Sequence, residues 1–178
     1  MSVAFTREED SEAAAADLPD RPVSTQPNLV TPAGLAQLES ALEAARAAYS
    51  AAQAGEGVSA DRTAMARATR DLRYYGARRA SAQLTLTPAD AATVAFGSTV
   101  TFEREDGRTQ RFRIVGEDEA DPAAGSVSYV SPLAQALLGK AVGDAAALVA
   151  GAEVEITAID QGVLLNKDDG RRQLTVGE

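Results

Sequence analysis

The sequence predicts an α+β protein in which an N-terminal antiparallel helical hairpin precedes a C-terminal antiparallel sheet with one short helix. Apolar residues in the first half of the 178-residue chain recur every three or four positions. In the second half they alternate with polar residues, which is the period of a strand. A proline-containing segment separates the two patterns. We therefore expect two structural units in this order.

The chain begins with an acidic segment. Residues 1–28 contain six acids, two arginines and three prolines. Segments of this kind cannot bury enough apolar surface to offset the entropy lost on folding. We predict a disordered acidic leader that solvates the chain, with an interaction role as the alternative.

A coiled-coil hairpin is predicted over residues 31–85. Thr31 is suited to cap the first helix, and Pro32 to open it. The first apolar stripe passes through Leu35, Leu38, Leu42, Ala45, Tyr49 and Ala52. The sequence AGEGVSAD then interrupts it at the expected tip, about residues 54–60. A second stripe follows through Met65, Ala68, Leu72, Tyr75 and Ala82. At ~1.5 Å per residue each arm is roughly 35 Å long.

Five arginines share one broad arc of the second helix, opposite its apolar stripe. They are Arg62, Arg67, Arg70, Arg73 and Arg78. This arc predicts a basic stripe that faces solvent. Two interpretations are open: contact with a polyanion, or a solubilising face that pairs with Glu39 and Glu43 of the first helix.

Beyond a linker at 86–93, alternating residues predict a sheet over 94–160. EDGR at 105–108 is typical of a hairpin turn. Ser131 and Pro132 are suited to begin a short helix, and Gly139 to end it. Residues 161–178 are expected to form a C-terminal extension, either one more hairpin or a loosely attached tail.

The composition excludes several classes of function. The chain contains no cysteine and no histidine, which removes thiol nucleophiles, disulfides and imidazole-based sites. A metal site made of carboxylates remains open. The net charge of −9 argues against general binding of nucleic acid by the whole molecule. We expect no membrane span and no signal peptide, and hence a soluble, cytoplasmic protein.

Several motifs resemble the GreA/GreB family of bacterial transcription elongation factors. They are VAFGSTV, IVGEDEAD, SPLAQALLGKAVGD and AEVEITAID, in this order over about residues 92–159. NLVTPAGLAQLESAL is similar to the opening of the family's first helix. The resemblance implies an FKBP-like C-terminal domain that docks at the rim of the secondary channel of core RNA polymerase. The coiled coil would then enter the channel.

The resemblance also implies which residues dock on the polymerase. They are Asp121, Ser131 and Pro132, to which Glu117, Asp118, Glu119 and Lys140 contribute. The alternative is a tight turn rich in solvated acids. The basic stripe would contact RNA or the acidic channel wall. We expect a monomer with no cofactor and no metal of its own.

The hairpin tip departs from the family's cleavage-stimulating members, which place an Asp and a Glu near a polymerase Mg²⁺. Here Glu56 has Ser59 three residues later, and the next acid is Asp61. Each arm also aligns as about two turns shorter, a deficit of roughly 10 Å. We therefore expect regulation of elongation without strong transcript cleavage, and no catalytic residues.

Three alternatives remain. The chain could be a true cleavage factor that uses Glu56 and Asp61 with the polymerase's Mg²⁺. It could instead be an FKBP-like binding module unrelated to polymerase, for which the aromatic residues of the domain are Phe96, Phe102, Phe112 and Tyr129. A metal enzyme that uses the GEDEAD acids is the third alternative.

Overall fold

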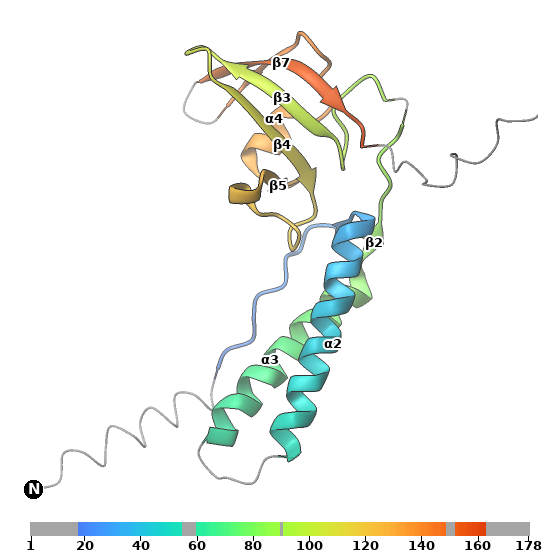
Figure 1. Ribbon diagram of the computed structural model, residues 1–178, viewed down its shortest axis with the longest axis vertical. Coiled ribbons are helices and arrows are strands. Elements are labelled where there is room, and N and C mark those ends of the chain that lie inside the picture. The colour runs from blue at the N-terminus through green and yellow to red at the C-terminus, as the bar shows by residue number, and fades with distance from the viewer. Residues whose placement is uncertain (1–17, 55–59, 90, 149–151, 163–178) are drawn as a thin grey trace, which may run out of the picture.

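The computed structural model describes residues 18–54, 60–89, 91–148 and 152–162. It is elongated: a helical hairpin projects from one end of a small sheet domain (Figure 1). Residues 1–17 of the predicted leader, most of the predicted tip and residues 163–178 lie outside the described part of the chain. The α+β prediction has two parts, a helical hairpin and a sheet. The structure confirms both.

The hairpin consists of α2 (Pro32–Ala54) and α3 (Ala60–Ser81). The Thr31 hydroxyl accepts a hydrogen bond from the backbone N–H of Gly34 at 3.0 Å, so Thr31 caps α2 as predicted. The seam buries Leu38, Leu42 and Ala45 of α2. Alanines line the groove beside these residues, and the hairpin is therefore a thin rod.

A two-stranded parallel ladder joins the two ends of the hairpin. Strand β1 (Leu29–Val30) precedes α2 and pairs with β2 (Gln83–Leu84), which follows α3. The ladder was not predicted, because two residues are too few to display an alternating pattern. It fixes both helices at the base of the hairpin, next to the sheet domain (Figure 1).

The main sheet has the strand order β5-β4-β3-β7-β6. Its strands are β3 (Thr99–Arg104), β4 (Thr109–Val115), β5 (Ser126–Ser128), β6 (Ala145–Ala147) and β7 (Glu153–Asp160). Strands β3 and β4 form the predicted hairpin around residues 105–108. The sheet is mixed, however, and not wholly antiparallel as predicted, because β5 pairs with β4 in parallel. The chain leaves β4, passes through the GEDEAD loop and returns beside β4 in the same direction.

Apolar side chains fill the space beneath the sheet. Val100, Phe102, Ile114 and Ile156 are completely buried. Helix α4 (Pro132–Leu137) adds Ala134 and Leu137 to this core. Within the described part of the chain, no helix is both long enough and apolar enough to cross a bilayer.

Candidate functional site

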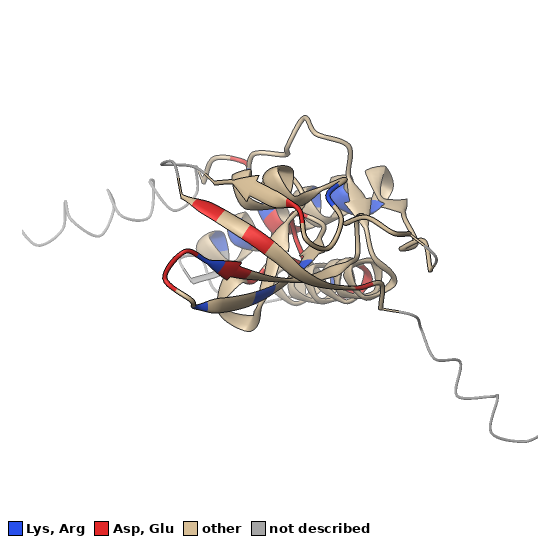
Figure 2. Ribbon diagram, turned by 90° about the horizontal axis from the view of Figure 1, so that it is seen from above, with Lys and Arg blue, Asp and Glu red and all other residues tan. Residues whose placement is uncertain are grey.

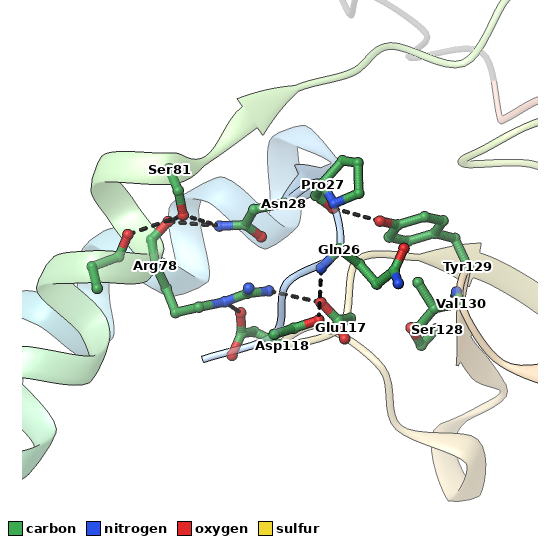
Figure 3. Close-up of polar contacts among 12 residues, drawn as sticks. Gln26, Pro27, Asn28, Arg78, Ser81, Glu117, Asp118, Ser128, Tyr129 and Val130 are labelled. Atoms are coloured by element: carbon green, nitrogen blue, oxygen red, sulfur yellow. Dashed lines mark hydrogen bonds and ion pairs between the residues drawn. The ribbon is translucent and has the colours of Figure 1, made fainter. Parts of the chain in front are cut away.

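Arg78 joins the hairpin to the sheet domain (Figure 3). Its side chain, in the last turn of α3, is only 2% exposed. Its Nε donates to Oδ2 of Asp118 at 2.5 Å, and its Nη2 lies 3.4 Å from Oε2 of Glu117. Because a buried arginine without a partner is strongly destabilising, these two acids hold the base of α3.

Tyr74 extends this contact by one helical turn. Its hydroxyl donates to Oδ1 of Asp118 at 2.6 Å. Burial, followed by the hydrogen bond to Asp118, raises the pKa of Tyr74 to about 12. The hydroxyl therefore keeps its proton at neutral pH and remains a donor. Asp118 binds two side chains of α3 at once.

The next acid of the loop contacts the start of α2. The Thr31 hydroxyl donates to Oε2 of Glu119 at 2.6 Å. Two glycines allow the close approach. A Cβ at Gly34 would lie 2.5 Å from Oε2 of Glu119, and one at Gly116 would lie 2.5 Å from the carbonyl oxygen of Leu29. The loop therefore packs directly on the base of the hairpin.

Residues 18–28, which we predicted as part of a disordered leader, contact both units. The Asn28 side chain donates to the carbonyl oxygen of Arg78 at 2.7 Å and to Oγ of Ser81 at 3.2 Å. The Tyr129 hydroxyl donates to the carbonyl oxygen of Pro27 at 2.5 Å. Burial, and to a smaller extent Glu117, raises the pKa of Tyr129. The boundary of the leader therefore differs from the prediction, since this segment has a fixed path.

The predicted docking residues separate into two groups. Glu117, Asp118 and Glu119 turn toward the hairpin, as described above. Asp121 is exposed and caps the 3-10 helix η1 (Pro122–Ala124), accepting from the N–H of Ala123 at 3.0 Å.

The second group continues at α4. Ser131 caps this helix by accepting from the N–H of Ala134 at 3.2 Å, and Pro132 beside it is exposed. The N–H of Lys140 donates to the carbonyl oxygen of Leu137, and its own carbonyl oxygen accepts from Val94. Asp121 and Pro132 are thus exposed docking candidates; Asp118 is also exposed as a residue, but its side chain is only 17% exposed.

Acidic residues also gather away from this loop. Glu103 and Glu105 on one side and Glu153 and Glu155 on the other line an open depression beside β3 and β7. Figure 2 shows acidic positions in red on strands and on a turn. The negative charge of the sheet domain is therefore distributed over more than one surface.

The basic stripe is shorter than predicted. Arg62, Arg67 and Arg73 are exposed, and Arg70 is half-buried beside Asp71, with Nε and Oδ1 3.8 Å apart. Assigning Arg78 to the solvent-facing stripe was wrong. Its arc of α3 meets the sheet domain at the hairpin base, where Arg78 is buried between acids.

We expected that arginines of the second helix could pair with Glu39 and Glu43 of the first. Among the described residues one such pair is present, and it involves Glu39. Nη2 of Arg79 lies 2.8 Å from Oε1 of Glu39, which links α3 to α2. Glu43 instead pairs with Arg46 of its own helix, at 2.5 Å. The arginine that pairs between the helices is therefore Arg79, which does not belong to the predicted basic stripe.

The acids proposed for the tip are not described. Glu56 lies outside the described residues, and of Asp61 only the backbone, within α3, is described. Among the described residues no group of three or more acidic side chains is placed to hold a metal ion.

Sequence reasoning missed four residues of this region: Arg21, Asn28, Tyr74 and Tyr129. Each acts on residues far away in the chain, as Tyr129 does on Pro27. Asn28 likewise bonds to Arg78 and Ser81, 50 and 53 residues away, and is not the residue that caps α2. None of the four therefore offered a local signal.

Comparison with known proteins adds a sequence relationship. Residues 89–161 match the family described as "Transcription elongation factor, GreA/GreB, C-term". Transcription elongation factor GreA of Desulfovibrio desulfuricans is 41% identical over 93 residues, which are 51% of this chain and 56% of that protein. GreB of Pseudomonas aeruginosa is 53% identical over 62 residues, 35% of this chain and 36% of that protein. The chain thus spans about half the length of the first of these relatives, and less of the second.

Among solved structures, the crystal structure of GreA factor homolog 1 (Gfh1) of Thermus thermophilus is 24% identical in sequence. The alignment covers 75% of this chain and 99% of that one, with a TM-score of 0.35.

Proposed function

Because the chain belongs, through its domain at residues 89–161, to the GreA/GreB family of transcription elongation factors, we propose that it binds bacterial RNA polymerase and regulates transcription. The family match carries this proposal. It includes the loop, strand and helix of residues 115–144, on which Asp121 and Pro132 are exposed. In this proposal the protein is a cytoplasmic monomer that docks at the secondary channel.

The docking surface in this proposal is centred on Asp121, Ser131 and Pro132, with Lys140 beside them. Glu117, Asp118 and Glu119 contribute in a different way. Their contacts with Arg78, Tyr74 and Thr31 support a role in orienting the hairpin relative to the docked domain. The direction of the hairpin decides whether it enters the channel, so an orienting contact affects activity without touching the polymerase.

The hairpin acts in this proposal by obstruction or competition within the channel. Its arms contain 23 and 22 residues, about 35 Å at ~1.5 Å per residue. The unpaired acid in the tip sequence supports regulation without strong transcript cleavage, and the chain is then no enzyme itself. The exposed arginines of α3 contact RNA or the acidic channel wall.

A test combines polymerase binding with transcript cleavage. The double variant Asp121→Lys/Pro132→Ala should bind core polymerase at least tenfold more weakly, since truncated interface charges cost ~2–5 kcal/mol. Asp106→Lys, in the exposed turn between β3 and β4, is the matched control and should bind normally. A double variant that is folded and binds as tightly as the parent refutes the docking surface.

The same complexes decide between the two hairpin functions. On a backtracked elongation complex the parent protein should cause little RNA shortening. Robust cleavage that Glu56→Ala abolishes would instead establish the cleavage factor that uses Glu56 and Asp61. The binding-module alternative has less support, because Phe102 stacks on Phe112 within the core and is completely buried.

A further inference from the structure

Residues 18–28, here called the N-terminal strap, run along α3 toward the base of the hairpin (Figure 1). At the distal end of the strap, Asp20 Oδ1 lies 3.2 Å from Nη1 of Arg73. Next to it, Nη1 of Arg21 lies 3.5 Å from Oδ1 of Asp71. The strap therefore covers part of the helix face that carries the basic stripe.

Arg21 is the anchor of this distal end. Its guanidinium carbon lies 3.7 Å from the centre of the Tyr74 ring and 5.0 Å from that of Tyr75. The two rings meet edge to face, with centres 5.3 Å apart. Two aromatic rings and the Asp71 carboxylate form a complete site for a planar cation. The strap is thus held by a specific contact and not by charge alone.

The two ends of the strap differ in burial. Asn28, at the base, is only 4% exposed and donates two hydrogen bonds. The side chains of Asp20 and Arg73 are 63% and 67% exposed, and those of Arg21 and Asp71 about half as much. Exposed ion pairs are weak and screened by salt. The distal half can therefore leave α3 while Asn28 keeps the strap attached.

The face of α3 that the strap covers at Tyr74 continues along the helix as a basic surface, and together they have the features of a single-strand binding surface. Arg67, Arg70 and Tyr74 are spaced three and four residues apart on α3, so they share one side of the helix. A basic track with an aromatic ring for stacking is how proteins bind single strands without sequence preference. An acidic protein surface would use the arginines but not the ring, which favours RNA as the ligand.

We propose that the N-terminal strap is an autoinhibitory contact, in which Asp20 and Arg21 occupy the Arg73–Tyr74 face of α3 until single-stranded RNA displaces them. This inference rests on the proposed contact of the basic stripe with RNA. The strap supplies a carboxylate where a phosphate would lie and a guanidinium where a base would stack. It thereby acts as a substitute for the ligand within the same chain.

The first measurement follows the strap itself. The chain has no cysteine, so Val23→Cys and Ala47→Cys, both at exposed positions, provide unique sites for spin labels. Arg21→Ala should broaden the distribution of distances between the labels. Arg108→Ala is the matched control: its partner Asp106 lies in the turn between β3 and β4, far from the strap, and the distribution should stay narrow. An unchanged distribution in Arg21→Ala overturns the proposed anchor.

The second measurement is the affinity for a short fluorescent oligouridine. Arg21→Ala should bind it about three- to tenfold more tightly. If the strap is closed about nine-tenths of the time, about one-tenth of the molecules can bind RNA, and the apparent affinity is about tenfold lower than that of the open form. This sign is diagnostic, because the loss of a positive charge would by itself weaken RNA binding. Asp20→Asn should change the affinity in the same direction by less.

Two results overturn autoinhibition. If Arg21→Ala frees the strap but leaves oligouridine binding unchanged or weaker, the strap is only a structural clamp. If Arg21→Ala strengthens binding of polyglutamate and not of oligouridine, the covered face is one for an acidic protein. Both measurements use the free chain, so a failure of polymerase binding would be detected separately.

Discussion

The sheet domain and the base of the hairpin are held together by different kinds of interaction. The sheet domain encloses apolar side chains such as Phe102 and Ile156, which are completely buried. The base of the hairpin encloses polar ones, and Arg78, Asn28 and Thr31 are at most 4% exposed. Apolar packing stabilises in proportion to buried area and tolerates small rotations, whereas hydrogen bonds and ion pairs are directional.

This difference explains how a thin hairpin can have a defined orientation relative to the sheet domain. Its own seam buries few large side chains, chiefly Leu38 and Leu42, and a groove of about 400 Å³, lined mostly by alanine, lies open between the helices. Packing within the hairpin therefore cannot determine how it meets the sheet domain. The buried polar contacts at its base can, and three consecutive acids of one loop supply most of them.

The largest effect is expected where the apolar core is broken. Phe102→Ala should lower the stability of the sheet domain by ~3–5 kcal/mol, because it leaves a cavity beneath the sheet. Amide hydrogen exchange in β3 and β7 measures this. Leu86→Ala is the control, since Leu86 is 64% exposed and its loss should change stability by less than about 0.5 kcal/mol. Equal effects of the two substitutions would contradict the assignment of the core.

A smaller and more local effect is expected at the base of the hairpin. Asp118→Asn removes the charge that faces Arg78 and should cost about 1–3 kcal/mol, as for a buried donor left with a weaker partner. Exchange should rise in the last turn of α3 and in the β1–β2 ladder, while β3 and β7 stay protected. Asp106→Asn makes the same chemical change at an exposed turn and serves as the control.

The outcome that contradicts this local effect is a uniform rise in exchange across both units.

A further variant tests whether apolar contacts can replace the polar contacts between the hairpin and the sheet domain. Replacing Arg78 by Met and Asp118 by Leu together should recover part of the lost stability, because apolar groups need no partner. It should not recover the direction of the hairpin, which spin labels on the two units would report.

Most of the local structure could be predicted from the sequence. Thr31 and Pro32 start α2, Ser131 and Pro132 start α4, and EDGR turns between β3 and β4. Each of these depends on residues within four positions of one another, so the sequence displays it directly. The same holds for Asp121, which caps the turn that immediately follows it.

The joint between the units could not be predicted in this way. Arg78 and Asp118 are 40 residues apart, and nothing near Arg78 distinguishes it from the other arginines of α3. The parallel pairing of β5 also depends on where the loop returns, which the alternating pattern does not encode. Pairing over such distances is decided by the assembled fold.

The smallest effect is expected at Tyr74, and it appears only at high pH. The pKa of Tyr74 is raised from 10.0 to about 12. Between these values the folded state keeps the proton and the unfolded state loses it, so stability falls as the pH rises through this window. Below pH 10 the hydrogen bond to Asp118 stabilises the fold by about 1 kcal/mol.

Tyr74→Phe should therefore be less stable than the parent at neutral pH, and the difference should shrink as the pH approaches 12. Urea unfolding at a series of pH values measures it. Tyr129→Phe is the control: its hydroxyl bonds to a backbone carbonyl, and the pKa of Tyr129 is raised in the same direction. Since Tyr129 is less buried than Tyr74, its pH-dependent difference should be the smaller one. A difference between Tyr74→Phe and the parent that stays constant with pH would mean that Asp118 does not hold the Tyr74 hydroxyl, and that Arg78 is the one described side chain of α3 that Asp118 binds.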